Sequence, residues 1–210
     1  MRRLLTAALL ATAACGNIGS PQITSTEVYD FRDVEVGDTL IFHWPRVDLP
    51  VRVWVASDSP IRTYVDTAIA RWQAAFLYGE FRATIVADSN LADVIVRNVP
   101  SDIGNGIYRQ AAECIGETDP NINVATNTLQ LPMHVFMYPA SSQTDAGLLT
   151  CYSITMTHEF GHVLGLWLHS PFPTDVMYAH PTVDGLSDRD RLTAEVLYLL
   201  TPTVTLTGRP

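Results

Sequence analysis

Two histidines and a glutamate stand in one short run of the chain, His158-Glu159-Phe160-Gly161-His162. If this run is helical, residues 158 and 162 lie about one turn apart on the same side, so both imidazoles can reach one metal ion. Imidazole nitrogens bind zinc at about 2 Å. Glu159 would lie beside the metal, where its carboxylate can accept a proton from a water molecule. The alternative is a helix whose histidines are ordinary surface or core residues.

A third nitrogen donor follows the predicted helix. Gly165 can adopt a left-handed backbone conformation, which ends the helix and turns the chain back. His169 comes four residues later, where the returning segment can bring it to the helical pair. Asp175 and His180 are the alternative third ligands, since a carboxylate can replace an imidazole at zinc.

Hydrophobic periodicity indicates the elements that position these residues. The alternation over 51–55 predicts a strand, and the spacing of Val65, Ile69, Trp72 and Phe76 predicts a helix. A long helix is expected over about 144–164 and a last one over 187–199. Further strands are expected at 40–44, 81–87, 92–99 and 131–138, with loops at 101–106 and 116–128. This order predicts an α+β fold with a mixed sheet backed by helices.

The segment from His158 to Tyr178 resembles the metzincin zinc peptidases, and most of all the matrixins. In that family a methionine turn follows the extended histidine motif, as Met177 does here. The resemblance implies a mixed twisted sheet with two helices in an upper lobe, an active-site cleft, and a small loop-rich lower lobe with a C-terminal helix. It departs in one respect: the usual spacing places the third histidine at position 168, whereas here it is His169. A loop absorbs one extra residue at little cost.

The same resemblance implies a zinc-dependent endopeptidase with one catalytic Zn²⁺, held by His158, His162 and His169. Glu159 would be the general base and Met177 a hydrophobic floor beneath the metal. Tyr178, directly after the methionine, is interpreted as part of the substrate-pocket wall and not as a ligand. The alternative function is a catalytically inactive zinc-binding surface lipoprotein that acts as a binding module. The intact glutamate argues against it, because binding zinc alone does not require that residue.

The substrate would be a peptide or protein that adds an extended strand to a sheet edge, and residues 131–138 are the expected edge. Ca²⁺ is a second candidate ion, because family members often bind it. The loops at 101–106 and 117–123 carry Asp, Asn and Gly, but they lack the ligand spacing of a known calcium loop. His43 and His134 have no motif around them and are interpreted as structural.

The first residues predict export. Met1-Arg2-Arg3 and the apolar stretch to Ala14 are typical of a signal peptide over 1–14. Small residues directly before Cys15 resemble a bacterial lipobox, so we expect lipidation of that cysteine and a lipid-anchored, extracytoplasmic protein. The alternative is an ordinary signal peptide cut near Ala14 and a secreted product. The expected organisation is a tether and N-terminal segment at 15–47, a catalytic domain at 48–200 and a tail at 201–210.

The composition of the chain limits the classes of molecule that it is expected to bind. The formal net charge is −9, and such an acidic chain would repel nucleic acid. No apolar run reaches the 18 or so residues of a membrane span, so membrane contact is expected only through the lipid anchor. Cys114 and Cys151 are the two cysteines beyond Cys15, and in an exported chain they predict one disulfide, with two buried thiols as the alternative. A monomer is expected.

Overall fold

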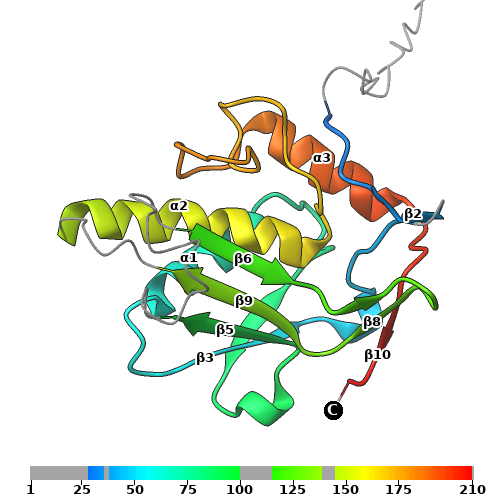
Figure 1. Cartoon of the computed structure of the whole chain (residues 1–210), viewed down its shortest axis with the longest axis horizontal. Coiled ribbons are helices and arrows are strands. Elements are labelled where there is room, and N and C mark those ends of the chain that lie inside the picture. Colours follow the sequence, from blue (N-terminus) through cyan, green and yellow to red (C-terminus); the bar gives the residue numbers. More distant parts are fainter. Residues whose placement is uncertain (1–27, 36–37, 100–114, 139–144, 210) are drawn as a thin grey trace, which may run out of the picture.

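A five-stranded sheet forms the centre of the molecule. The computed structural model describes residues 28–35, 38–99, 115–138 and 145–209 (Figure 1). The sheet order is β4-β3-β5-β9-β6. These strands span Ala83–Val86, Val51–Val55, Val94–Asn98, Met133–Tyr138 and Ile115–Asp119, respectively. The first four are parallel, and β6 runs antiparallel to β9, which confirms a mixed sheet in an α+β fold.

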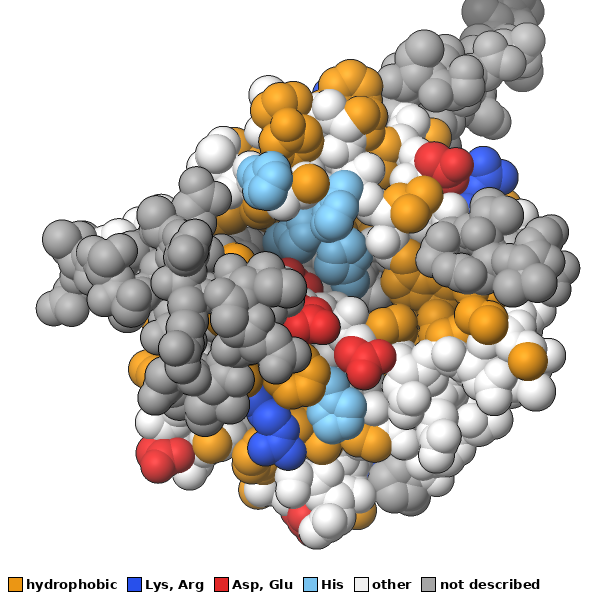
Figure 2. All heavy atoms as spheres, viewed as in Figure 1, with side chains coloured by type: hydrophobic (Ala, Val, Ile, Leu, Met, Phe, Trp, Pro, Cys, Tyr) orange, Lys and Arg blue, Asp and Glu red, His pale blue; other side chains and the backbone are white. Residues whose placement is uncertain are grey.

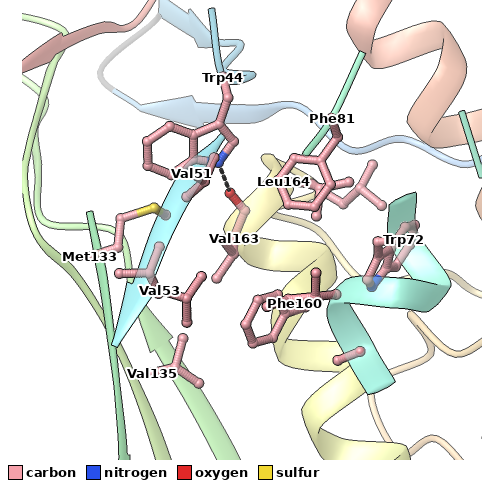
Figure 3. Packing of buried hydrophobic residues seen from close by; sticks show 14 of the residues in the cluster. Trp44, Val51, Val53, Trp72, Phe81, Met133, Val135, Phe160, Val163 and Leu164 are labelled. Atoms are coloured by element: carbon pink, nitrogen blue, oxygen red, sulfur yellow. Dashed lines mark hydrogen bonds between the residues drawn. The ribbon is translucent and has the colours of Figure 1, made fainter. Parts of the chain in front are cut away.

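One face of this sheet packs against two helices. Alternation along β3 buries Val51, Val53 and Val55 on that face. Helices α1 (Arg62–Gln73) and α2 (Asp145–Leu164) pack together there (Figure 3). Trp72 of α1 is fully buried, and its indole N–H donates to the carbonyl of Thr157 on α2 at 2.8 Å. Truncating such a side chain typically costs about 3–5 kcal/mol, so this contact does much to fix α2 against α1.

The chain after α2 is mostly irregular until α3 (Asp188–Leu199), which lies beyond α2 from the sheet in Figure 1. The N-cap of α3 is Ser187, whose hydroxyl accepts from the backbone N–H of Asp190 at 3.0 Å. In return the Asp190 carboxylate accepts from the Ser187 N–H at 2.9 Å, which completes a capping box. Between the two helices, Ser170 and Tyr178 form an isolated β-bridge.

Two segments expected to be irregular are strands. The predicted loop at 116–128 contains most of β6, then β7 (Ile122–Asn123) and the start of β8 (Thr128–Gln130). The predicted tail contains β10 (Thr205–Thr207), which pairs in parallel with β8. Gly, Asp and Asn favour turns in isolation, but neighbouring strands supply backbone partners that override this preference.

The folded part also begins earlier than residue 48. The short strands β1 (Asp33–Glu35) and β2 (Asp38–Leu40) pair antiparallel, and two 3₁₀ turns follow at Arg46–Asp48 and Ser89–Leu91. The indole N–H of Trp44 donates to the carbonyl of Val163 on α2 at 2.8 Å (Figure 3). Tyr29, Phe31 and Phe42 are buried in the same core. The described residues 28–35 and 38–47, within the expected tether and N-terminal segment, therefore pack against the domain expected at 48–200, and the strand expected at 40–44 is β2 at Asp38–Leu40. None of the described helices has the length and apolarity of a membrane span.

The end of the chain is held by a buried carboxylate. Asp93, at the start of β5, is fully buried and accepts from Arg52 Nη2 at 2.7 Å and from Arg209 Nη2 at 3.0 Å. Arg209 also pairs with Asp48 at 2.6 Å. Burial alone would raise the pKa of the Asp93 carboxyl, but the hydrogen bonds from Arg52 and Arg209 outweigh it and lower the pKa below its ordinary value of 3.8.

Replacing Asp93 with Asn should destabilise the fold by roughly 2 kcal/mol or more near pH 7, because two arginines lose their shared partner. The folded-state pKa is depressed, so this stabilisation is present above the unfolded value and is lost as pH falls through the folded one. The gap in unfolding free energy between wild type and Asp93→Asn should therefore shrink below about pH 4. Urea unfolding at several pH values measures it. A gap that stays constant down to pH 2 would contradict the ion-pair account.

Candidate metal centre

Helix α2 places two histidines on one side, one turn apart. The ring centroids of His158 and His162 are 4.8 Å apart, and their Nε2 atoms are 3.1 Å apart. The helix ends at Leu164, and Gly165 follows with a φ of +111°. A Cβ at this glycine would overlap the carbonyl oxygen of Phe42, so the reversal of the chain needs glycine both for its φ and for the close approach.

The returning segment brings the third histidine to this pair. The ring of His169 lies 5.1 Å from that of His158 and 5.2 Å from that of His162, centroid to centroid. One potential ligand atom from each of the three lies within 4.8 Å of the other two. Among the described residues, these three form the one cluster of His, Cys, Asp or Glu side chains that could hold a metal ion. The extra residue between Gly165 and His169 therefore does not keep the third ring away.

Backbone carbonyls orient the two helical rings. Nδ1 of His158 lies 2.7 Å from the carbonyl oxygen of Val176, and Nδ1 of His162 lies 2.6 Å from that of Leu166. A carbonyl can only accept, so each Nδ1 carries the proton and each Nε2 presents a lone pair. Backbone carbonyls often serve this purpose behind metal-binding histidines. Both lone pairs are thus directed toward one small region beside the third ring.

The donor set fits a zinc ion. Zinc–nitrogen distances of about 2.0–2.1 Å at tetrahedral angles separate two ligand nitrogens by roughly 3.3 Å, close to the 3.1 Å between the Nε2 atoms of His158 and His162. Burial lowers the pKa of His158 to about 4. Burial, and then the charges of His158 and His169, lower the pKa of His162 well below its usual value. Burial, and then the charge of His180, also lower the pKa of His169. All three rings are therefore neutral at pH 7, the form that binds a metal.

The alternative third ligands are engaged elsewhere or outside the group. Asp175 is buried, and its Oδ2 accepts from the Ser170 hydroxyl at 2.6 Å and from Arg189 Nε at 2.9 Å. That carboxylate ties the returning loop to α3. His180 is exposed and does not belong to the three-histidine group. His169 is the third donor that the geometry favours.

A buried carboxyl group lies beside the histidines. Glu159 is 3% exposed, and its Oε2 accepts from the hydroxyl of Thr118 on β6 at 2.7 Å. A Cβ at Gly116, two residues earlier on the strand, would overlap the Glu159 side chain, so the strand leaves this space for it. Burial raises the pKa of Glu159 to about 7, Thr118 lowers it and the nearby Glu117 raises it. Such a group can take up or release a proton near neutral pH.

Met177 packs against the histidine-bearing helix at Gly161, and its expected role as a floor beneath the metal stays a prediction. It is fully buried, and a Cβ at Gly161 would overlap its sulfur. The turn around it is held by Asp190, which accepts from the backbone N–H of Val176 at 2.9 Å and of Met177 at 3.4 Å. Val176 in turn supplies the carbonyl that orients His158. The Asp190 carboxylate on α3 therefore holds Val176, and Val176 in turn orients the ring of His158.

A cavity of about 530 Å³ opens between the first half of α2 and the loop before α3. Its lining comes from both elements: Thr150, Ile154, Thr174, Thr182, Val183, Asp184, Gly185, Leu186 and Ser187. Tyr178, expected in the wall of a substrate pocket, is half-buried but is not among these residues. None of His158, His162, His169 and Glu159 lines this cavity; the lining residue of α2 nearest to them in sequence is Ile154, four residues before His158.

The remaining residues considered in the sequence either make structural contacts or lie outside the described part of the chain. Nε2 of His43 lies 3.0 Å from the carbonyl of Leu200, which supports a structural role. His134 stacks on Phe136 on the outer face of the sheet. Cys15, Cys114 and the loop at 101–106 lie outside the described residues, so lipidation, the disulfide to Cys151 and that calcium site stay predictions.

Three residues that support the site from behind are not predicted as such by the sequence, namely Gly116, Thr118 and Asp190. The first two lie in a segment taken for a loop, and a two-residue spacing of Gly and Thr is too common to be a signal. Asp190 carried one signal, because it lies three residues after the N-cap Ser187. That position predicted a helix start but not its bonds to the methionine turn.

Replacing any one of His158, His162 and His169 with Ala should weaken zinc binding by at least about 100-fold. Losing a ligand costs more than the roughly 10–100-fold typical of residues that only orient one. Competition with a chromophoric chelator measures the affinity, and the wild type should bind one equivalent. His43→Ala and His180→Ala are matched controls that should retain wild-type affinity. Unchanged affinity in His169→Ala would remove that residue from the ligand set.

Comparison with models of protein families gave no match, and comparison with curated proteins gave none either. What the chain does is therefore inferred from the geometry of its own residues. Three neutral imidazoles converge on one region, and Glu159, the chain neighbour of His158, carries a buried carboxyl group. This arrangement can hold one metal ion and move one proton.

Proposed function

We propose that the chain is a zinc-dependent endopeptidase of the metzincin type, with His158, His162 and His169 as ligands of one catalytic zinc. The observation that carries the proposal is the buried Glu159 carboxyl group beside three convergent, neutral imidazoles. A protein that only stored or sensed zinc would gain nothing from burying an acidic group there, because desolvating it costs free energy.

A zinc ion at this site would polarise a water molecule and the carbonyl of the peptide bond. Glu159 accepts the proton that the attacking water releases and later returns it to the amine of the leaving segment. Thr118 donates to one carboxylate oxygen, and this fixes the orientation of the other. Buried surroundings keep the pKa of this group near neutral pH, where it can both accept and return a proton.

The substrate would bind as an added strand at β6. In the sheet order β6 is an end strand that pairs with β9, so the earlier expectation that residues 131–138 form the edge is wrong. β6 also carries Gly116 and Thr118, which contact Glu159. A peptide hydrogen-bonded along this edge would therefore pass beside the proton-transfer group. Main-chain bonding of this kind recognises extended, unstructured segments.

The remaining sequence-based expectations belong to the same proposal. The enzyme would be exported, anchored through a lipid on Cys15 or otherwise secreted, and active as a monomer on peptides or proteins. Its two-lobed architecture would follow the matrixins, with the sheet, α1 and α2 above the cleft and α3 in the lower lobe. Nucleic acid is not an expected partner because of the negative charge of the chain.

Replacing Glu159 with Gln tests the catalytic role directly. The variant should keep one equivalent of zinc and its fold, yet cleave casein at least about 100-fold more slowly, since a general base typically contributes 10²–10⁴-fold. Glu195→Gln on α3 is the matched control and should cleave at the wild-type rate. Equal rates for Glu159→Gln and wild type would refute the catalytic assignment. A wild type that binds zinc and cleaves nothing would favour the binding module.

Replacing Gly116 with Ala tests how Glu159 is positioned. The added methyl group would overlap the Glu159 side chain and displace it, so kcat should fall about 10–100-fold, the scale of misplacement effects. Zinc affinity should remain unchanged, because Gly116 contacts none of the three histidines in the contacts described. Gly185→Ala, where an added Cβ meets no atom within 4 Å, is the matched control. Normal activity of Gly116→Ala would show that Glu159 tolerates the shift.

A further inference from the structure

Two acidic side chains line the outer side of the proposed substrate edge. Glu117 and Asp119 are exposed on β6, and Thr118 between them points the other way, toward Glu159. Successive side chains of a strand point to opposite faces, so both carboxylates lie on the sheet face away from the helices. Figure 2 shows acidic side chains directly beside the group of histidine side chains, where the surface is hollowed.

Neither carboxylate has an ion-pair partner among the described residues. The described ion pairs of the chain involve other acidic residues: Asp30, Asp48, Asp93, Asp175 and Asp184. Glu117 accepts from the hydroxyl of Tyr138 at 3.3 Å, and Asp119 accepts from the backbone N–H of Asn121 at 2.8 Å. Both bonds are to neutral donors, so no cationic side chain in the described part of the chain pairs with either charge.

The described strands of the outer face bring no arginine next to these two carboxylates. The strand order places β9 between β6 and β5. On β9, Phe136 is the register partner of Glu117, and His134 is that of Asp119. The described arginine on β5 of this face, Arg97, lies over the Trp54 ring of β3 at 5.9 Å, on the far side of β9. β9 itself carries no Arg or Lys, so among the described residues the strand next to β6 brings no permanent positive charge to Glu117 and Asp119.

An added strand would bring its own side chains beside these charges. Residues directly opposite on paired strands have Cβ atoms about 4.5–5.5 Å apart, and opposite charges there stabilise the pair. We propose that the cleft selects extended peptides that carry Arg or Lys at alternate positions, on the side chains that face outward beside Glu117 and Asp119. This inference rests on the proposed peptidase function and names its substrate class as basic segments.

Peptides with a common scissile core and Arg, Gln or Glu at each successive flanking position test this selection at about pH 8. The wild type should prefer Arg over Gln and Gln over Glu at alternate positions, by about two- to fivefold in kcat/KM per position. The ratio of Arg to Glu peptides should fall as salt rises, since exposed charges are screened.

Glu117→Gln/Asp119→Asn should abolish the charge preference, measured as the ratio of kcat/KM for Arg and Glu peptides within the variant, because the absolute rate also reflects the effect of Glu117 on the pKa of Glu159. Glu117→Arg/Asp119→Arg should invert the preference toward Glu peptides, which no loss of folding can mimic. Asp66→Asn/Glu195→Gln removes the same charge from α1 and α3, and it should keep the wild-type preference. An unchanged Arg-to-Glu ratio in the β6 variants, or no alternation in the wild type, overturns the inference.

Binding separates this inference from the peptidase proposal. Glu159→Gln should bind the Arg peptides more tightly than the Glu peptides by a similar factor, measured by fluorescence polarisation. If the wild type cleaves no peptide but this binding preference exists and disappears in Glu117→Gln/Asp119→Asn, only the peptidase proposal fails. If cleavage is normal and the preference is absent, only the charge selection fails.

Discussion

The two helical histidines hold their Nε2 lone pairs 3.1 Å apart in a largely buried place, and much of the fold serves to keep them there. Two lone pairs at this separation repel each other unless a cation lies between them or one is protonated. Burial makes protonation unfavourable, as the low pKa values of both rings reflect. The carbonyls of Val176 and Leu166 hold both Nδ1 protons, which keeps the two Nε2 lone pairs directed at the same region.

Those two carbonyls explain why the segment after α2 must be so well anchored although it has little regular structure. Leu166 lies just beyond the reversal at Gly165, and Val176 lies in the methionine turn. The buried Asp190 holds this turn by accepting from the backbone N–H of Val176. Asp190 also caps α3 and accepts from the hydroxyl of Tyr29 at 3.0 Å. One carboxylate therefore joins the N-terminal segment, the turn and the last helix. Movement of α3 would be transmitted to the His158 ring.

The sequence was informative wherever the chemistry depends on local spacing. His158 and His162 are adjacent because α2 is helical, and Gly165 returns the chain because of its own φ. The segment around β6 could not be predicted in this way, because Gly116 and Asp119 favour turns when considered alone. Its strand state depends on pairing with β9, which the sequence does not reveal. For the same reason Arg209 was read as tail, although Asp93 binds it from more than one hundred residues away.

Two glycines leave room for the side chains of Glu159 and Met177. The missing Cβ of Gly116 leaves the space that Glu159 occupies, and that of Gly161 leaves the space for the sulfur of Met177. Glycine is unfavourable inside both strands and helices, by roughly 0.5–1 kcal/mol relative to Ala. Burying a carboxyl group adds a further cost, which its raised pKa reflects. A fold shaped only by stability would fill these positions with alanine and an apolar side chain. The chain instead keeps both costs at the one place where three imidazoles converge, which is typical of a site shaped by chemistry.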